Sequence, residues 1–182
     1  MVTQCIFIGD STVGKTSIIR AALSNIEGPQ FHQAKRISVP TIGVDVKHHV
    51  TDDGEVLNIW DTSGDPKFHS LVRMFEKSCN TIVYVFAANE EASFQSILRW
   101  HAELYNNSKK YICVCNKTDL TSGIDFKHRI THLYPEMIFV ESSNVVTDNG
   151  KRILESILAN SNETYKENLQ APSLSSSCCT VS

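Results

Sequence analysis

Eight residues near the N-terminus, Gly9 to Thr16, read Gly-Asp-Ser-Thr-Val-Gly-Lys-Thr and match the G-x-x-x-x-G-K-[ST] phosphate-binding loop at every required position. The apolar run from Val2 to Ile8 predicts a buried strand before the loop, and Ser17 to Leu23 has the apolar spacing of a helix after it. A chance match would lack this strand and helix. The loop therefore predicts an α/β fold that binds a nucleotide.

The residue types in this loop suit a triphosphate with a metal ion. Gly9 and Gly14 allow a tight turn whose backbone N–H groups point inward at a helix N-terminus, which favours an anion. Lys15 supplies a cation to the β- and γ-phosphates, and the Thr16 hydroxyl is a suitable ligand for Mg²⁺. The expected phosphate contacts come from Ser11, Thr12, Val13, Gly14, Lys15, Thr16 and Ser17.

Composition limits the remaining possibilities. The 182 residues, 41% of them hydrophobic, suffice for one domain with one sizeable core. A formal net charge of -3 without a basic run argues against nucleic-acid binding. The six cysteines lack disulfide or zinc spacing, and we expect reduced thiols. No stretch looks like a signal peptide or a membrane span, so we expect a cytosolic body.

Strand and helix patterns alternate along the chain. We expect strands at Val44 to Val50, Glu55 to Trp60, Thr81 to Ala88, Tyr111 to Cys115 and Met137 to Val140, and helices within Lys67 to Ser78, after Asn89, within Asp125 to Leu133 and after Asp148. Residues 44–60 form a hairpin in this interpretation. The order predicts a P-loop nucleotide-binding domain over residues 1–160, with a mostly parallel six-stranded sheet, one antiparallel edge strand and helices on both faces. Residues 161–182 are polar and Ser-rich, which predicts a flexible tail.

A second motif follows the strand that ends at Cys115. Asn116, Lys117, Thr118 and Asp119 fit the N-K-x-D pattern. The Asp119 carboxylate can accept hydrogen bonds from N1 and the 2-amino group of guanine, whereas adenine offers an acceptor at N1 and no 2-amino group. Unpaired buried polar groups make such a site selective by about 10⁴ or more. The bound nucleotide is therefore expected to be GTP or GDP.

Three further residues are expected beside the terminal phosphate. Asp61 ends a predicted strand and can hold Mg²⁺ through a water, while Thr41 offers the metal a second hydroxyl. Gly64 allows a backbone N–H to approach the γ-phosphate closely. Loss of that phosphate would release the Thr41 and Gly64 segments, which is an order–disorder switch.

With these motifs the chain resembles a small GTPase of the Ras superfamily, and most closely the Rab branch. The resemblance rests on the phosphate loop, on Ile42-Gly43-Val44-Asp45, on Ile59-Trp60-Asp61-Thr62-Ser63-Gly64, and on Ser93-Phe94 with Trp100. It implies a monomeric GTP/GDP switch in vesicle trafficking that cycles between cytosol and the cytoplasmic face of intracellular membranes. It also implies a nucleotide exchange factor, a GTPase-activating protein, a GDP dissociation inhibitor or escort protein, and effectors as partners.

The residue after Gly64 departs from the family pattern. Asp65 stands where the resemblance implies a water-orienting Gln, and Pro66 where it implies a Glu. An ionised carboxylate only accepts hydrogen bonds and is repelled by the γ-phosphate, so we expect slow hydrolysis by a catalytic set of Lys15, Thr41, Gly64 and Asp65. Two classes stay open: a GTP-hydrolysing switch, and a hydrolysis-poor GTP-bound adaptor on a membrane. A phosphotransferase is disfavoured because no acceptor site is visible.

Other departures concern the base and an edge strand. The segment between Lys15 and Thr41 is several residues longer than usual; Phe31 either covers the guanine or packs locally. Ser143 and Asn144 are expected to contact the base, although Val145 replaces the usual Lys of that motif. His48 and His49 point to opposite faces of a strand, which favours a solvated edge over a metal site.

The C-terminus reads Cys178-Cys179-Thr180-Val181-Ser182. The pair resembles the Cys-Cys endings of some Rab proteins, and the last four residues also fit C-a-a-X, nominally a farnesyl signal. The tail lacks a basic patch, and one lipid chain alone binds a membrane only marginally. We therefore expect two geranylgeranyl groups, on Cys178 and Cys179, with one farnesyl group or no lipid as the alternatives.

Overall fold

The computed structural model describes residues 2–27, 40–51, 54–120, 125–143 and 149–159. Its six strands form one sheet in the order β2-β3-β1-β4-β5-β6, in which β2 pairs antiparallel with β3 and the other neighbours are parallel. The strands are β1 (Val2–Ile8), β2 (Val44–Val50), β3 (Val56–Thr62), β4 (Thr81–Ala87), β5 (Lys110–Asn116) and β6 (Ile138–Glu141). The helices are α1 (Lys15–Glu27), α2 (His69–Glu76), α3 (Glu91–Leu104), α4 (Phe126–Leu133) and α5 (Asn149–Leu158), with short 3₁₀ turns η2 (Pro66–Phe68) and η3 (Thr118–Leu120).

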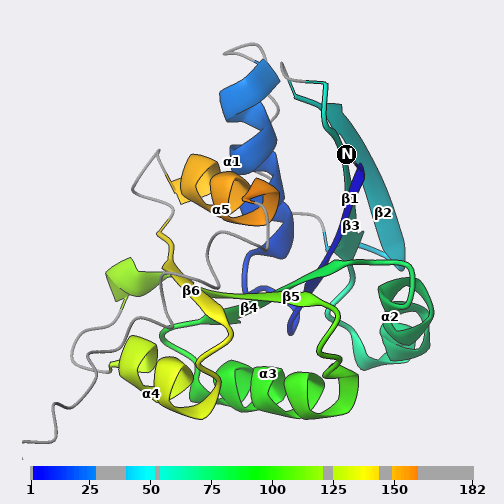
Figure 1. Ribbon diagram of the computed structural model, residues 1–182. Helices are drawn as coiled ribbons and strands as arrows, with labels where there is room; N and C mark the ends of the chain where they lie inside the picture. The colour runs from blue at the N-terminus through cyan, green and yellow to red at the C-terminus, as the bar shows by residue number, and fades with distance from the viewer. Residues whose placement is uncertain (1, 28–39, 52–53, 121–124, 144–148, 160–182) are drawn as a thin grey trace, which may run out of the picture.

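Helices cover both faces of the sheet (Figure 1). Alternate residues of β1 divide between two apolar clusters: Cys5 and Phe7 face α1 and α5, while Ile6 and Ile8 face α2, α3 and α4. Each of these four side chains is at most 1% exposed. A central strand covered on both faces must be apolar on both, which explains the uninterrupted hydrophobic run in the sequence.

The predicted fold class is confirmed, including the antiparallel edge strand. Most element boundaries differ from the predicted ones by one or two residues. The first helix differs more: it begins at Lys15, inside the phosphate loop, and extends to Glu27. The second helix lies within its predicted range, and Pro66 opens a separate 3₁₀ turn before it, where a missing backbone N–H costs nothing.

The described cysteines, Cys5, Cys79, Cys113 and Cys115, are free thiols and buried, as their apolar surroundings in the sequence predict. Burial raises the pKa of the Cys115 thiol to about 12. Such thiols behave as small apolar side chains. None of the helices in the described ranges is both long enough and apolar enough to cross a membrane.

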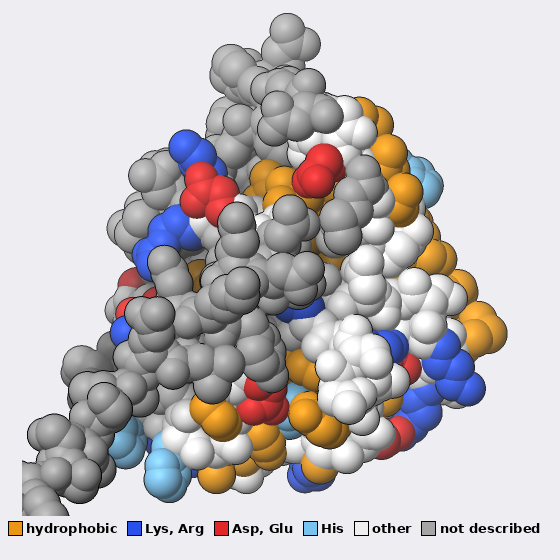
Figure 2. Space-filling view, viewed as in Figure 1, with side chains coloured by type: hydrophobic (Ala, Val, Ile, Leu, Met, Phe, Trp, Pro, Cys, Tyr) orange, Lys and Arg blue, Asp and Glu red, His pale blue; other side chains and the backbone are white. Residues whose placement is uncertain are grey.

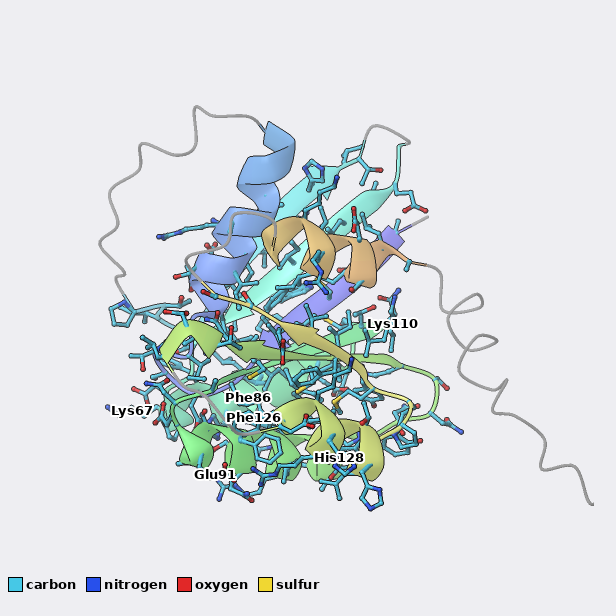
Figure 3. All side chains as sticks on the ribbon, turned by 90° about the vertical axis from the view of Figure 1, so that its left-hand side faces the viewer. Lys67, Phe86, Glu91, Lys110, Phe126 and His128 are labelled. Atoms are coloured by element: carbon cyan, nitrogen blue, oxygen red, sulfur yellow. The ribbon has the colours of Figure 1, made fainter. Side chains whose placement is uncertain are left out.

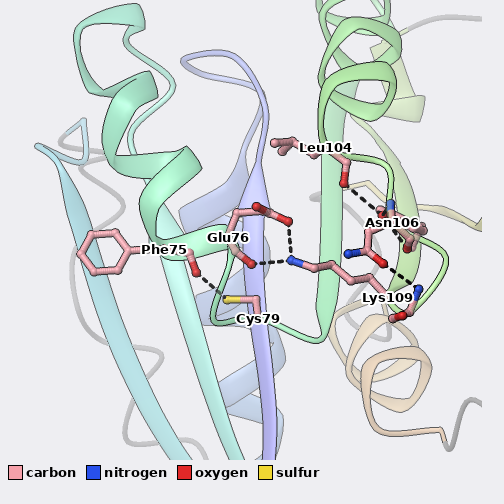
Figure 4. A network of polar contacts seen from close by, with 8 residues as sticks. Phe75, Glu76, Cys79, Leu104, Asn106 and Lys109 are labelled. Atoms are coloured by element: carbon pink, nitrogen blue, oxygen red, sulfur yellow. Dashed lines mark hydrogen bonds and ion pairs between the residues drawn. The ribbon is translucent and has the colours of Figure 1, made fainter.

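A polar network fixes the C-terminal end of α2 (Figure 4). Lys109, in the loop before β5, forms an ion pair with the Glu76 carboxylate and donates to the Glu76 backbone oxygen at 2.7 Å. Both side chains are nearly buried, with 11% and 9% of their surfaces exposed. Nearby, the Cys79 thiol donates to the Phe75 carbonyl oxygen at 3.4 Å. The helix that follows Gly64 is therefore anchored at its far end.

Candidate functional site

The phosphate loop joins the carboxyl end of β1 to α1 and wraps around the amine of Lys15. Lys15 is 6% exposed, and its Nζ donates to the carbonyl oxygens of Gly9 at 2.7 Å and Asp10 at 2.8 Å. Burial lowers the pKa of this amine to about 8, against the opposing influence of Asp61 and Asp10. A bound polyphosphate would supply the negative charge that such a buried ammonium requires.

The three predicted metal ligands come together from three separate elements. The Thr16 hydroxyl at the start of α1 donates to Asp61 Oδ2 at the end of β3 over 2.7 Å, and lies 3.0 Å from the Thr41 hydroxyl. Thr41 Oγ1 is 3.4 Å from the same carboxylate oxygen. This group of hard oxygen atoms beside Lys15 has the chemistry that Mg²⁺ prefers.

Asp61 shows that the site fits a cation. The residue is 2% exposed, and its Oδ1 has no hydrogen-bond partner among the described residues. Burial raises the pKa of this carboxyl, whereas the hydrogen bond from Thr16 and the charge of Lys15 act to lower it. An unpaired buried carboxylate oxygen is costly unless a ligand satisfies it, and Mg²⁺ with its waters would do so.

The segments that contain Thr41 and Gly64 contact each other and the phosphate loop. The Ser63 N–H donates to the Gly43 carbonyl oxygen at 2.8 Å. A Cβ atom on Gly64 would lie 2.2 Å from the Asp10 carbonyl carbon and the Ser11 nitrogen, so only glycine fits at this approach. This bond extends the antiparallel pairing of β2 with β3 by one residue pair beyond Val44 and Thr62.

Asp65 is engaged locally. Its backbone is extended, with φ −75° and ψ 128°, as a residue before proline prefers. The Asp65 carboxylate caps the η2 turn by accepting from the Lys67 N–H at 3.0 Å, and its own N–H donates to Ser63 Oγ at 3.2 Å. The sequence shows the absence of Gln here, but the capping role is visible only in the structure.

The guanine motif lies at the carboxyl end of β5, beside the phosphate loop. Asn116 is fully buried, and its Nδ2 donates to the Val13 carbonyl oxygen at 2.8 Å. Gly14 makes room for this amide, because a Cβ there would lie 2.3 Å from Asn116 Nδ2. Asp119 is exposed, and Lys117 has a positive φ of 59°. Asn116 thus ties the base-binding loop to the phosphate loop.

The segment after β6 joins the same region. Thr118 donates to the Ser142 carbonyl oxygen through its backbone N–H at 3.3 Å and through its hydroxyl at 3.2 Å. Ser143 is buried next to this contact. Asn144, Phe31, Cys178 and Cys179, together with the tail of residues 161–182, lie outside the described residues.

The other loop residues differ in exposure. Ser11, Thr12 and Ser17 are exposed, and Val13 is buried. Thr12 has a φ of 66°, in the left-handed region that a β-branched residue rarely adopts. Thr12 is therefore a point of backbone strain in the phosphate loop.

The prediction of a solvated edge at His48 and His49 is right for only one of the two. His48 is exposed, with its Nδ1 2.6 Å from Asn58 Oδ1. His49 is 8% exposed, because its cross-strand partner Leu57 belongs to the apolar cluster beneath α1 and α5. The edge strand therefore has one covered face.

Comparison with known proteins agrees with this geometry. The model of the Ras family matches residues 4–166. The chain is 30% identical over 127 residues to the Ras-related protein RABG3b of Arabidopsis thaliana, covering 66% of this chain and 61% of that protein. It is 29% identical over 172 residues to the Ras-related protein Rab-5B of Plasmodium falciparum, covering 90% and 80%, and 31% identical over 128 residues to the GTP-binding protein YPT53 of Saccharomyces cerevisiae, covering 67% and 55%.

The matched region is thus less than two thirds of the length of the Arabidopsis and yeast relatives. Ras-family GTPases in general bind guanine nucleotide with Mg²⁺ and hydrolyse GTP, and the sheet order and phosphate loop seen here suit that fold. The chain belongs to the Ras family and is a Ras-superfamily GTPase most similar to Rab proteins.

Proposed function

We propose that this chain is a Rab-type molecular switch that binds GTP or GDP with Mg²⁺ and hydrolyses GTP slowly. The observation that carries the proposal is the meeting of Thr16, Thr41 and Asp61 beside the buried amine of Lys15. Two of these four residues, Thr16 and Lys15, come from the phosphate loop, while Thr41 and Asp61 come from segments that would sense the terminal phosphate. Such convergence suits a site that distinguishes a triphosphate from a diphosphate.

Each residue has a distinct role in this proposal. The N–H groups of the loop and the Lys15 amine hold the β- and γ-phosphates, and the Gly64 N–H contacts the γ-phosphate. The hydroxyls of Thr16 and Thr41 would bind Mg²⁺ directly, and Asp61 would bind it through a water. Mg²⁺ held there would supply positive charge to the phosphate oxygens. When the γ-phosphate leaves, the contacts of Thr41 and Gly64 with it are lost, and both segments change conformation.

Selectivity for guanine is proposed to rest on the exposed carboxylate of Asp119. The test is competition of GTP, ATP and XTP for the purified protein in the presence of Mg²⁺. The unmodified protein should prefer GTP over ATP by about 10⁴ or more. Asp119→Asn should shift the preference toward XTP, because the new amide can donate to the C2 carbonyl of xanthine. Equal affinities for ATP and GTP in the unmodified protein would refute the assignment.

One observation favours the second candidate, a hydrolysis-poor adaptor that stays loaded with GTP. The Asp65 carboxylate is occupied by the Lys67 N–H, and it replaces the Gln that would orient the attacking water. Single-turnover GTP hydrolysis, with the nucleotide content measured on isolation, separates the two candidates. A slow but measurable rate supports the switch, and a GTP-loaded protein without turnover supports the adaptor.

We further propose a role in vesicle trafficking, which the Rab and Ypt names of the relatives support. Membrane attachment would come from geranylgeranyl groups on Cys178 and Cys179, with an exchange factor, an activating protein, a dissociation inhibitor or escort protein, and effectors as partners. Intact-mass measurement of the native protein should show two geranylgeranyl groups. One farnesyl group would favour the C-a-a-X interpretation, and an unmodified mass would refute lipidation.

A further inference from the structure

The outer face of α4 presents two histidines one helical turn apart. Phe126 and Ile130 are buried in the cluster that α4 forms with β4 and α3. His128 follows Phe126 by two positions, and His132 follows Ile130 by two. Each histidine is therefore about 200° around the helix axis from the buried residue that precedes it. Both are exposed. Figure 3 labels His128 on α4, and Figure 2 shows histidine side chains at the surface in the region that α4 occupies in Figure 1.

The two imidazole rings already lie side by side. Their centroids are 6.1 Å apart and their planes differ by 3°. Side chains four positions apart on a helix are neighbours, with Cβ atoms about 5–6 Å apart. Within the described ranges, neither ring has a hydrogen bond or an ion pair, so the ring nitrogens are available to a ligand.

The surroundings do not oppose a cation at this position. Arg129 lies between the two histidines in sequence, but its guanidinium is turned to the α3 side of the helix. There it pairs with the Glu91 carboxylate at 2.8 and 3.0 Å and lies 4.3 Å from the centroid of the Phe94 ring. The backbone of α4 is held by Asp125, whose carboxylate accepts from the His128 N–H at 2.8 Å. The helix therefore supplies a fixed frame for two side chains that are free to turn.

We propose that His128 and His132 together bind one divalent cation of the class that prefers imidazole, Cu²⁺, Ni²⁺ or Zn²⁺. Metal–nitrogen bonds of about 2.0–2.1 Å at adjacent coordination positions require the two nitrogens to come about 3 Å apart. Rotation of the exposed rings about χ1 and χ2 achieves this without disturbing the core. Paired histidines at i and i+4 on one helix face are a known geometry for such ions.

Water would complete the coordination shell. In the described part of the chain, no cluster of three or more His, Cys, Asp or Glu residues could form a closed metal site. A two-histidine site is therefore open, and its ion exchanges with solvent. Mg²⁺ prefers oxygen ligands and does not compete for it. Because the site shares no residue with the nucleotide site, its failure would leave the proposed switch untouched.

The test uses the full chain loaded with GDP and Mg²⁺, titrated with Ni²⁺ while backbone amide resonances are recorded. The paramagnetic ion should broaden the signals of Phe126–Leu133 first, and diamagnetic Zn²⁺ in excess should restore them. A matched control, the double variant His132→Ala/Leu133→His, keeps the number of histidines but places the second one off the shared face. Leu133 is 51% exposed, so the change is confined to the surface.

The register variant should require at least about tenfold more Ni²⁺ for the same broadening, because the second imidazole no longer binds intramolecularly. Equal Ni²⁺ requirements in the two proteins, or broadening centred on another part of the chain, would overturn the proposal. The same spectra show whether the variant is folded.

Discussion

At the scale of single residues, the proposed slow hydrolysis depends on Asp65. A Gln amide can donate to one oxygen while accepting from the attacking water, whereas an ionised carboxylate only accepts. A second reason to expect slow turnover is that the Asp65 side chain caps the η2 turn through the Lys67 N–H. The negative charge of Asp65, its short side chain and its capping role are thus all expected to slow GTP hydrolysis.

Two substitutions separate these effects. Asp65→Gln should raise the single-turnover rate of GTP hydrolysis by about a hundredfold to a thousandfold, the scale of one positioned polar group. It should also weaken the η2 turn by about 1 kcal/mol through loss of the cap. Asp65→Asn removes the charge, keeps a good capping residue and is as short as Asp, so it should remain slow. If the Gln variant is no faster than the original, Asp65 does not limit hydrolysis.

At the scale of elements, the anchored end of α2 is the clearest packing feature outside the site. The Glu76 carboxylate is nearly buried, and the Lys109 ammonium neutralises it while also donating to the Glu76 backbone oxygen. Removing one member of such a pair leaves an uncompensated charge, which is more costly than replacing both. The pair therefore holds α2 against the start of β5.

Lys109→Met should lower the free energy of unfolding by about 3 kcal/mol, measured by urea denaturation at a fixed excess of GDP and Mg²⁺. Lys109→Arg keeps the charge and should lower the free energy of unfolding much less. The double variant Glu76→Gln/Lys109→Met should recover most of the loss because no unpaired charge remains. A loss below about 0.5 kcal/mol for Lys109→Met would show that the pair behaves like an exposed one.

His101 on α3 is a second buried polar side chain. It is 2% exposed, its ring contacts those of Tyr84, Tyr105, Tyr111 and Tyr134, and its Nε2 is 3.5 Å from Glu136 Oε1. Burial lowers the pKa of His101, and Glu136 opposes this only in part. The folded protein therefore favours the neutral ring, and the unfolded chain takes up a proton more readily.

Stability should accordingly decrease as the pH falls below about 6.5, the ordinary value for histidine, with at most about 1.4 kcal/mol per pH unit from this group. The measurement is the free energy of unfolding between pH 7.5 and pH 5.5. His101→Phe keeps an aromatic ring without a titrating nitrogen and should make this dependence shallower. An unchanged slope in the variant would assign the dependence to other groups.

Particular elements also show which features of the fold and the site could be predicted from the sequence alone. The phosphate loop, the strand ends with Asp61 and Asn116, and the antiparallel hairpin follow from local patterns, because each pattern reflects burial or backbone geometry within a few residues. The contact of Asn116 with Val13 spans 103 positions, and that of Lys109 with Glu76 spans 33. The burial of His49 depends on which face of the edge strand is covered. Such contacts depend on tertiary packing, which local periodicity does not encode.

At the scale of the whole molecule, the site is built where three strand ends meet the first helix. β1 leads into the phosphate loop, β3 places Asp61 one residue before its end and β5 ends with Asn116. Parallel strands place these carboxyl ends at one edge of the sheet, where open α/β sheets bind ligands.

Hydrogen exchange of the protein loaded with GDP or with a non-hydrolysable GTP analogue, each with Mg²⁺, tests the proposed switch most directly. Exchange should be slower in the GTP-analogue state at residues 40–43 and 63–68, where the Ser63 N–H bonds the Gly43 carbonyl oxygen. Residues 116–119 should exchange alike in both states, because the proposal assigns them to the base, which GDP and GTP share. Identical exchange throughout the chain in the two states would contradict a GTP-dependent switch.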